Sequence, residues 1–351
     1  MSFPQVSIIL RTKNRNLFLR RALASIDSQV FTDYELLIIN DGGEEEPIAK
    51  LLAEKSALAE KTRLITNPES LGRDGAWRQG VNEAAGTFCA IHDDDDTWDP
   101  DFLQQTVAFL HTHPNHNAVA VRLEVIAEEQ HGDDFTELFR WIYQPHDSSL
   151  SLGNFLRSNK TVPIATLYRT AAARAAMPEG EFPVVEDWLL NLNLALQGPF
   201  GFIDGKPLAF WHQRPNDLSA DTGNSITSLA QLHKELDAQI RDTHLREYID
   251  EHGLGLVLHL SGLHERLSVK LDQQEREIAD LKQQTQSLAE EISKVNEYRD
   301  TISELSQQIA DLSQHVQSLS ENLRTIPRPV QTMMRISGAA ARKESKKKPR
   351  S

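Results

Sequence analysis

Four consecutive aspartates occupy residues 93–96, separated only by His92 from an apolar stretch that ends at Ile91. Carboxylates this close repel one another and raise each other's pKa unless a cation compensates their charge. Mg²⁺ and Mn²⁺ are held by carboxylate oxygens together with the phosphates of a substrate. Because side chains alternate along an extended segment, Asp93 and Asp95 are expected on one side of it. The cluster therefore predicts a divalent metal site, and the alternative is an acidic surface loop.

A second acidic pair, Glu186 and Asp187, stands between two valines and an apolar helical pattern that begins at Trp188. A carboxylate within hydrogen-bond reach of a hydroxyl group can accept its proton during a transfer reaction. The pair could therefore supply a general base. The alternative is that both acids only stabilise the first turn of a helix through its dipole.

The elements that must position these residues alternate between short apolar strands and helical patterns. The expected strands cover residues 6–10, 35–39, 62–65 and 87–91, and the expected helices cover residues 17–26, 48–58 and 75–85. This alternation indicates βαβ units around a mostly parallel sheet. Ligands of such sheets bind outside the carboxyl ends of the strands. Residues 11–15, Asp41 and the aspartate cluster are therefore expected at one edge.

Several segments resemble the family 2 glycosyltransferases with the GT-A fold. Residues 91–100 (IHDDDDTWDP) resemble that family's Asp-x-Asp-Asp-x-Trp-x-Pro segment, and residues 6–15 resemble its first strand and nucleotide loop. Residues 40–43 (NDGG) are similar to its Asp-Asp-Gly-Ser turn, with asparagine in place of the first acid. Residues 67–72 and 84–86 fit the stretch that leads into the acidic cluster. The match covers about the first 215 residues, in the family's order and spacing.

The resemblance implies roles for the matching residues. Asp93 and Asp95 would hold Mn²⁺ or Mg²⁺, with Asp95 as the direct ligand that bridges the ion to the donor's diphosphate. Asp187 would be the catalytic base. Contacts to the donor or the acceptor are predicted for Thr12, Asn14, Arg15, Asp41, Asn67, Arg73, Asp93, Asp94, Glu186, His212 and Arg214.

Some of these assignments have alternatives. Asp41 would accept a hydrogen bond from the nucleoside base, although an aspartate before a glycine is also a common turn residue. His212 and Arg214 stand in the reverse of the family's order, and either could reach the diphosphate or the metal. Arg73 or Arg78 could contact a phosphate, or could be a solvated arginine on a helix.

The remainder of the chain separates by composition. Residues 218–264 are expected to be helical. In residues 265–326 the apolar residues alternate at spacings of three and four over about eight heptads, which predicts a coiled coil and a homo-oligomer. The alternative is one long helix folded back on the first domain. Residues 327–351 are proline-containing and basic, and they predict a disordered tail that is solvated or attracted to anionic lipid head groups.

The expected fold class is therefore α/β: a GT-A, Rossmann-like, mostly parallel sheet with flanking helices in residues 1–217, then a helical segment and a long C-terminal coiled coil. The net charge of −14 argues against nucleic-acid binding. Cys89 is the single cysteine, which excludes an intramolecular disulfide and fits a reducing compartment. No run approaches the about 20 apolar residues that span a bilayer, and no secretory signal is visible. The expected location is cytoplasmic, or peripheral at the inner face of the plasma membrane.

The function predicted from these features is an inverting, metal-dependent glycosyltransferase that moves a sugar from a nucleotide-diphosphate donor to a hydroxyl group. The acceptor is expected to be a glycan or a lipid-linked glycan in bacterial surface polysaccharide synthesis. Two alternatives stay open. One is a coiled-coil scaffold with an inert transferase-like domain. The other is a sugar nucleotidyltransferase, which would need a glycine-rich phosphate loop that residues 11–15 lack.

Overall fold

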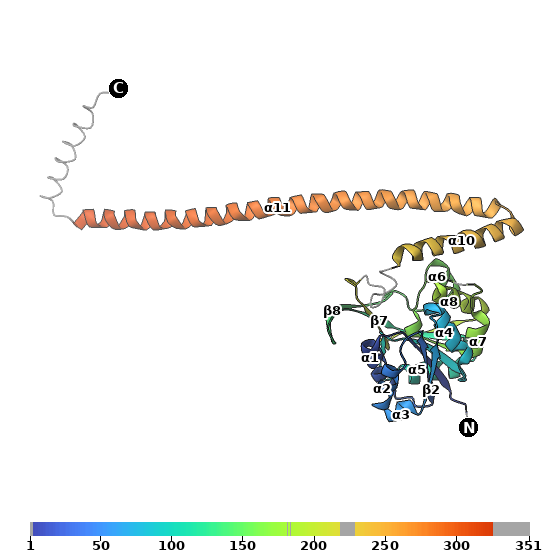
Figure 1. Cartoon of the computed structure of the whole chain (residues 1–351). Coiled ribbons are helices and arrows are strands. Elements are labelled where there is room, and N and C mark those ends of the chain that lie inside the picture. The colour runs from blue at the N-terminus through green and yellow to red at the C-terminus, as the bar shows by residue number, and fades with distance from the viewer. Residues whose placement is uncertain (1–2, 181, 183, 218–228, 326–351) are drawn as a thin grey trace. The chain divides into compact units, whose positions relative to one another are not determined.

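The computed structural model describes residues 3–180, 182, 184–217 and 229–325. The chain forms two compact units, Met1–Tyr248 and Ile249–Ser351, which are described separately. Figure 1 shows the elements of both units in chain order.

The first unit is built on a seven-stranded sheet with the strand order β10-β6-β9-β4-β1-β2-β3. Its strands are β1 (Val6–Thr12), β2 (Tyr34–Asp41), β3 (Thr62–Asn67), β4 (Phe88–Asp93), β6 (Ala118–Val121), β9 (Thr166–Arg169) and β10 (Phe200–Ile203). Strands β4, β1, β2 and β3 are mutually parallel, and β9 is antiparallel to both β4 and β6. The carboxyl ends of the four parallel strands therefore meet at one edge, as the strand–helix alternation predicts.

Helices cover both faces of this sheet. They are α1 (Asn16–Asp27), α2 (Glu46–Ala53), α3 (Ser56–Ala59), α4 (Gly72–Glu83), α5 (Phe102–Thr112), α6 (Leu152–Arg157), the 3₁₀ turn η1 (Pro163–Ala165), α7 (Thr170–Ala176) and α8 (Glu186–Gln197). Every residue of β1 is buried. Ile8 and Leu10 join the core cluster with α1 and α5, whereas Ile9 joins the cluster with α4, α7 and α8. This alternation of side chains explains why a central parallel strand reads as a continuous apolar run.

A second, four-stranded sheet has the order β5-β11-β7-β8. Its strands are β5 (Thr97–Trp98), β7 (Leu123–His131), β8 (Asp134–Ile142) and β11 (Ala209–Gln213). Strand β11 runs parallel to β7 and antiparallel to β5, the short strand that follows the aspartate cluster. The end of the domain is thereby brought back to the edge where the aspartates lie.

Two helices follow. Helix α10 (Ala230–His252) contributes Ile240 to a small core cluster with Trp188 and Leu189 of α8. The residue after its last turn, Gly253, has a φ of +75° in the left-handed region. The Gly253 N–H donates a hydrogen bond of 2.7 Å to the carbonyl of Ile249, and this conformation terminates the helix. Helix α11 (Gly255–Thr325) is a continuous helix of 71 residues in the second unit.

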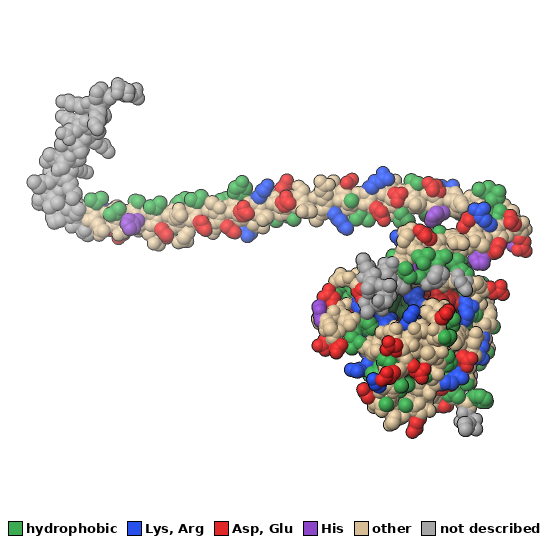
Figure 2. All heavy atoms as spheres, viewed as in Figure 1, with side chains coloured by type: hydrophobic (Ala, Val, Ile, Leu, Met, Phe, Trp, Pro, Cys, Tyr) green, Lys and Arg blue, Asp and Glu red, His purple; other side chains and the backbone are tan. Residues whose placement is uncertain are grey.

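The predicted heptad residues of α11 are solvent-exposed in this single chain. Their exposed fractions lie between 52 and 65%, and Figure 2 shows hydrophobic side chains at the surface along α11. The residues are Leu271, Ile278, Leu281, Leu288, Ile292, Val295, Ile302, Leu305, Ile309, Leu312, Val316, Leu319 and Leu323.

The predicted α/β fold class is confirmed: a mostly parallel sheet with flanking helices is followed by a helical segment and a long C-terminal helix. The pairing of that helix into a coiled coil and the region boundaries stay predictions. The predicted tail, residues 327–351, lies outside the described residues. Among the helices that are described, none is long and apolar enough to cross a membrane.

We expect the contact between α4 and β1 to be sensitive to size. A Cβ atom at Gly80 would lie 2.2 Å from Cγ2 of Ile9, which is fully buried. Gly80→Val should therefore lower the free energy of unfolding by about 1–3 kcal/mol, the usual cost of overpacking. Gly153→Val in α6 is the matched control, because a Cβ there meets only Ser151 Oγ at 3.8 Å. Urea unfolding followed by circular dichroism checks this, and equal stability of the two variants would contradict it.

Candidate active site

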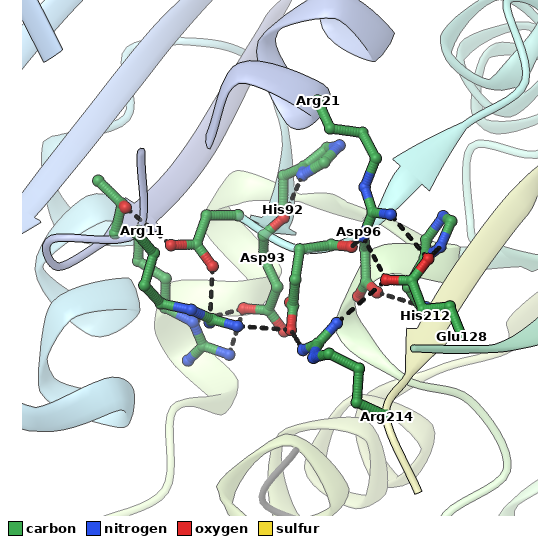
Figure 3. Close-up of polar contacts among 12 residues, drawn as sticks. Arg11, Arg21, His92, Asp93, Asp96, Glu128, His212 and Arg214 are labelled. Atoms are coloured by element: carbon green, nitrogen blue, oxygen red, sulfur yellow. Dashed lines mark hydrogen bonds and ion pairs between the residues drawn. The ribbon is translucent and has the colours of Figure 1, made fainter. Parts of the chain in front are cut away.

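The aspartate cluster forms a tight turn between β4 and β5. The Asp96 N–H donates to the carbonyl of Asp93 at 3.3 Å, which closes the turn. Because β1 and β4 are parallel neighbours in register, Arg11 lies opposite Asp93. The Arg11 guanidinium forms an ion pair with Asp93 and also donates to the carbonyl of Arg73 at 2.8 Å (Figure 3).

Arg15 and Arg214 meet at the next two carboxylates. Arg15 donates to Asp94 at 2.7 Å and to Asp95 at 2.9 Å. Arg214 donates to the same Asp95 oxygen. Both guanidinium groups also lie over the ring of Phe18, at 4.5 and 4.6 Å from its centroid. Two cations from opposite ends of the domain are thus held together by one carboxylate and one aromatic face.

Arg214 belongs to a second, buried row of polar contacts. Glu128 on β7 accepts hydrogen bonds from Arg21 at 2.8 and 2.9 Å, from Arg214 at 3.3 Å and from His212 Nδ1 at 2.8 Å. The other ring nitrogen of His212 lies 2.9 Å from the hydroxyl of Thr97. His212 therefore supports Arg214 through their shared partner Glu128 (Figure 3).

Asp96 fastens this row to the cluster. Its carboxylate accepts the backbone N–H of His212 at 2.9 Å, and it is almost fully buried. Asp96 thus ties β11 to the turn after β4. Sequence reasoning missed Glu128 and Arg21, because neither stands in a motif and both act through partners more than 70 residues away.

The two middle aspartates differ in their pKa values because their surroundings differ. Burial raises the pKa of Asp94 to about 7, although Arg15 opposes this rise. Burial acts on Asp95 in the same way, but Arg15 and Arg214 outweigh it and hold its pKa well below the usual range. These surroundings favour the ionised form of Asp95 more strongly than that of Asp94.

Burial and hydrogen bonds also set the pKa values of Glu128 and His212. Burial raises the pKa of Glu128, but hydrogen bonds from His212 and Arg21 outweigh it and lower the value to about 2. Burial lowers the pKa of His212. Both lowered pKa values agree with a neutral His212 that donates from Nδ1 to an ionised Glu128 and accepts from the Thr97 hydroxyl at Nε2.

The carboxylates suit a hard divalent cation. Asp93 is bonded to Arg11 through Oδ1, and Asp95 to its two arginines through Oδ2, so each has a second oxygen outside these contacts. Within the described residues, no group of three or more acidic, histidine or cysteine side chains is arranged to hold a metal. A cation at Asp93 and Asp95 would thus need further ligands, such as the phosphates with which Mg²⁺ sites are commonly completed.

The predicted nucleoside side lies at the ends of β2 and β3. Asp41 accepts hydrogen bonds from Asn67 Nδ2 at 3.1 Å, Ser70 Oγ at 2.6 Å and the N–H of Leu71 at 2.7 Å. Asn14, which has a φ of +54°, accepts the N–H of Glu44 at 2.8 Å. Asn14 and Asn67 therefore shape the loops around Asp41.

Thr12 connects this side to the cluster, since its hydroxyl donates to Asp94 at 2.7 Å. The structure thus brings Thr12 and Arg15 against Asp94, next to the strand ends that carry Asp41 and Asn67.

The second acidic pair begins α8, after Val185 in the left-handed conformation with a φ of +62°. Glu186 is buried and forms an ion pair with Arg78, which also donates to the carbonyl of Pro178 at 2.9 Å. Asp187 is half-buried and accepts a hydrogen bond from Asn159 Nδ2 at 2.8 Å.

Asp187 is electrostatically linked to the rest of the site. Burial raises the pKa of Asp187, and the positive charge of Arg73 opposes that rise. Arg73 lies in the first turn of α4, and its carbonyl accepts a hydrogen bond from Arg11, which pairs with Asp93. Arg73 therefore acts on both acidic sites: on Asp187 through its charge and on Asp93 through Arg11.

Residues 7–170 match the family model described as Glycosyl transferase family 2. An uncharacterized glycosyltransferase of Haemophilus influenzae is 28% identical over 129 residues, which cover 37% of this chain and 40% of that protein. The UDP-Glc:alpha-D-GlcNAc-diphosphoundecaprenol beta-1,3-glucosyltransferase WfgD of Escherichia coli is 27% identical over 105 residues, which cover 30% of this chain and 40% of that protein. The chain thus spans about two fifths of the length of these two relatives.

Two solved structures are also similar. The structure of S. aureus TarS in complex with UDP-GlcNAc has 18% identity and a TM-score of 0.49, covering 61% of this chain and 60% of that one. The mannosyltransferase PcManGT from Pyrobaculum calidifontis, in complex with GDP-Man and Mn²⁺, has 15% identity and a TM-score of 0.45, covering 62% and 59%. The family match itself contains the aspartate cluster and supports a role in glycosyl transfer for residues 7–170.

Proposed function

We propose that this protein is a metal-dependent, inverting glycosyltransferase that uses a nucleotide-diphosphate sugar as the donor. One observation carries the proposal. Two arginines and a threonine from separate elements converge on Asp94 and Asp95 at the carboxyl edge of the sheet, and Thr12, Arg15 and both aspartates lie inside the family match. Such a charged edge is where the ligands of parallel sheets bind.

The donor's diphosphate would lie against the aspartate cluster. Asp93 and Asp95 would hold Mn²⁺ or Mg²⁺ through the oxygens that do not bond their arginines. When bound, the cation supplies charge stabilisation for the departing diphosphate. Arg15 and Arg214 lie beside Asp95 and are suited to stabilise the same negative charge. Thr12 and Asp41 would position the nucleoside at the neighbouring strand ends.

Asp187 would act as the catalytic base. Asn159 engages its Oδ2 and orients the carboxylate. The acceptor hydroxyl oxygen forms a bond to the anomeric carbon while the bond from that carbon to the diphosphate oxygen breaks. Asp187 takes the hydroxyl proton, and the bonding electron pair leaves with the nucleoside diphosphate. This single displacement inverts the anomeric centre.

We expect Asp187→Asn to lower the rate of sugar transfer by about 10²–10⁴-fold, because it removes the proton acceptor. The affinity for the nucleotide should change less than twofold. The wild-type rate should fall with decreasing pH through a pKa above that of an ordinary aspartate, since the raised pKa of Asp187 causes protonation to begin at higher pH. Transfer assays across pH, with calorimetry of nucleotide binding, check both points.

Asp204→Asn is the matched control for this prediction. Asp204 forms an ion pair with Arg122 and is 53% exposed, so its loss should leave the transfer rate unchanged. Full activity of Asp187→Asn would remove Asp187 from the mechanism.

The metal prediction concerns Asp95. In the wild type, EDTA should weaken the binding of UDP or GDP at least tenfold, because a cation held by Asp93 and Asp95 would supply positive charge for the diphosphate. In Asp95→Asn the affinity should be low and insensitive to EDTA. Asp99→Asn is the control, since Asp99 pairs with Lys206 instead. Titration calorimetry with and without Mn²⁺ measures the difference, and equal affinity of the wild type under both conditions would be incompatible with a metal role.

The two alternative functions are separated by the same titration. No binding of UDP or GDP under any condition would favour a scaffold with an inert domain. A sugar nucleotidyltransferase remains the weaker alternative, because the loop after β1 contains no glycine to cradle a triphosphate.

We also propose that α11 pairs with the same helix of a second copy. A helix with apolar residues at heptad spacing buries them in knobs-into-holes contacts with a partner helix. The exposed heptad residues of α11 extend from Leu271 to Leu323. Such a pairing would make the protein a homo-oligomer that presents two or more active sites together.

Light scattering of the full chain tests this pairing. The wild type should have the mass of an oligomer, and Leu305→Asp combined with Leu312→Asp should have a lower mass, because both positions face the predicted seam. The matched control is Gln307→Asp combined with Gln314→Asp, on the outer face of the helix. A monomeric wild type would rule the pairing out.

The acceptor is proposed as a glycan, either free or linked to lipid, in bacterial surface polysaccharide synthesis. The E. coli relative is named for a lipid-linked saccharide acceptor, which supports this choice. A cytoplasmic protein with peripheral membrane contact through residues 327–351 would fit such an acceptor. That segment lies outside the described residues, so the membrane contact rests on its basic sequence.

A further inference from the structure

Aromatic side chains occupy alternate positions at the end of β8. Phe139 is 57% exposed and Trp141 is 40% exposed, and their rings stack with centroids 5.5 Å apart. Tyr143, two residues further on, is half-buried and packs edge-on against Trp211 at 5.9 Å. We call these four residues the aromatic row. Exposed apolar patches of this kind mark binding surfaces.

A β-bulge directs the row to one face of the four-stranded sheet. Ala127 pairs with Phe139, but Glu128 pairs with Glu137, so the residue between them on β8 has no partner. Before the bulge, Phe135 faces the aspartate side and packs against Phe18 at 5.3 Å. After the bulge, Phe139 and Trp141 point to the opposite face, because an inserted residue reverses the alternation of side chains.

The register confirms that the row shares this face with β11. Trp211 pairs with Val125, and Val125 pairs with Trp141, so all three side chains project to the same side. Gln213 is the next β11 residue on that side, since it pairs with Ala127. Trp141 on β8, Val125 on β7 and Trp211 on β11 therefore lie side by side on this face, and the Gln213 amide is on the same face of β11.

The row leads to the candidate base. The Tyr143 hydroxyl donates to the carbonyl of Asn159 at 3.4 Å, and the side chain of Asn159 donates to Asp187 at 2.8 Å. Tyr143 is also close enough for the charge of Asp187 to raise its pKa, after burial, which is the larger cause. One end of the row thus meets the residue that binds Asp187, and the other end is open to solvent.

We propose that the aromatic row binds the saccharide chain of the acceptor, with pyranose rings stacked on Phe139 and Trp141 and the reacting sugar next to Asp187. This inference rests on the proposed function. A pyranose ring has an apolar C–H face, which packs on the negative face of an aromatic ring, and hydroxyl groups at its edge. The Phe139 and Trp141 ring centroids lie 5.5 Å apart, so the two rings form one continuous aromatic surface. Gln213 can bond a hydroxyl at the edge.

The strand edge argues against a second copy of the chain as the occupant. β8 is the edge strand of its sheet and carries the ion pair of Arg140 with Glu137, together with the 3.0 Å pair of Arg140 with Glu124. Charges on an edge strand disfavour pairing with another strand. Phe139 and Trp141 keep 57% and 40% of their surface exposed, which leaves surface for a ligand on the outer side of the stacked pair.

The test is ¹⁹F NMR of the full chain labelled with 5-fluorotryptophan, with the Trp141 signal assigned from Trp141→Phe. Maltotetraose, chitotetraose and xylotetraose serve as probes. At least one should shift the Trp141 signal at millimolar concentration. Phe139→Ala should weaken that binding at least tenfold. Phe3→Ala, which removes an aromatic ring that is 82% exposed elsewhere, should leave it unchanged.

A second readout is kinetic. With the tetrasaccharide that shifts the Trp141 signal as the acceptor, Trp141→Ala should raise its KM at least tenfold and change kcat and the affinity for UDP or GDP in the presence of Mn²⁺ less than twofold. Trp141→Phe should restore most of the acceptor affinity. If nucleotides bind but none of the three saccharides shifts the Trp141 signal, the inference is overturned and the proposed function stands. If nucleotides also fail to bind, the proposed function itself fails. A Trp141 signal that moves with protein concentration alone would identify a second copy as the occupant and would also contradict the inference.

Discussion

Compensating the charge of residues 93–96 is the constraint on which the rest of the first unit depends. Asp94, Asp95 and Asp96 are buried, and carboxylates in such surroundings are costly unless cations or hydrogen bonds offset their desolvation. The compensation comes from distant parts of the chain: Arg11 on β1, Arg15 before α1, and Arg214 after β11. Asp95 can stay ionised in this buried position only when Arg15 and Arg214 are in place around it.

This constraint accounts for the second sheet. Arg214 can reach Asp95 only if β11 returns to the edge of the main sheet, and two contacts secure that return. Asp96 accepts the backbone N–H of His212, and Glu128 on β7 holds both the His212 ring and Arg214. The four-stranded sheet is therefore a frame for one arginine as well as a part of the core. Strand β8, at the far edge of this sheet, takes no part in these two contacts. The bulge in β8 turns Phe139 and Trp141 to the opposite face of the sheet.

The sequence predicted the local features well. Strands β1 to β4 are recognisable because buried parallel strands are continuous apolar runs, and topology alone then places Asp41 and residues 93–96 at one edge. Glu128 and Arg21 could not be found, since a charged residue on an amphipathic element looks solvated until the fold supplies its partner 107 residues away. The aromatic row was hidden for a related reason. One unpaired residue reverses the side-chain alternation of β8, and no sequence pattern indicated where the bulge would fall.

The same arginines that stabilise the turn are suited to the proposed reaction. A guanidinium group bonds a carboxylate or a phosphate with similar geometry, so Arg15 and Arg214 can exchange an oxygen of Asp95 for an oxygen of the donor. Asp95 would then need another positive partner, and a divalent cation held by Asp93 and Asp95 would supply that charge. Glu128 keeps Arg214 in place meanwhile, because it holds that side chain through a separate nitrogen. In the proposed reaction the same arginines would therefore stabilise first the turn, through Asp95, and then the diphosphate, through its oxygens.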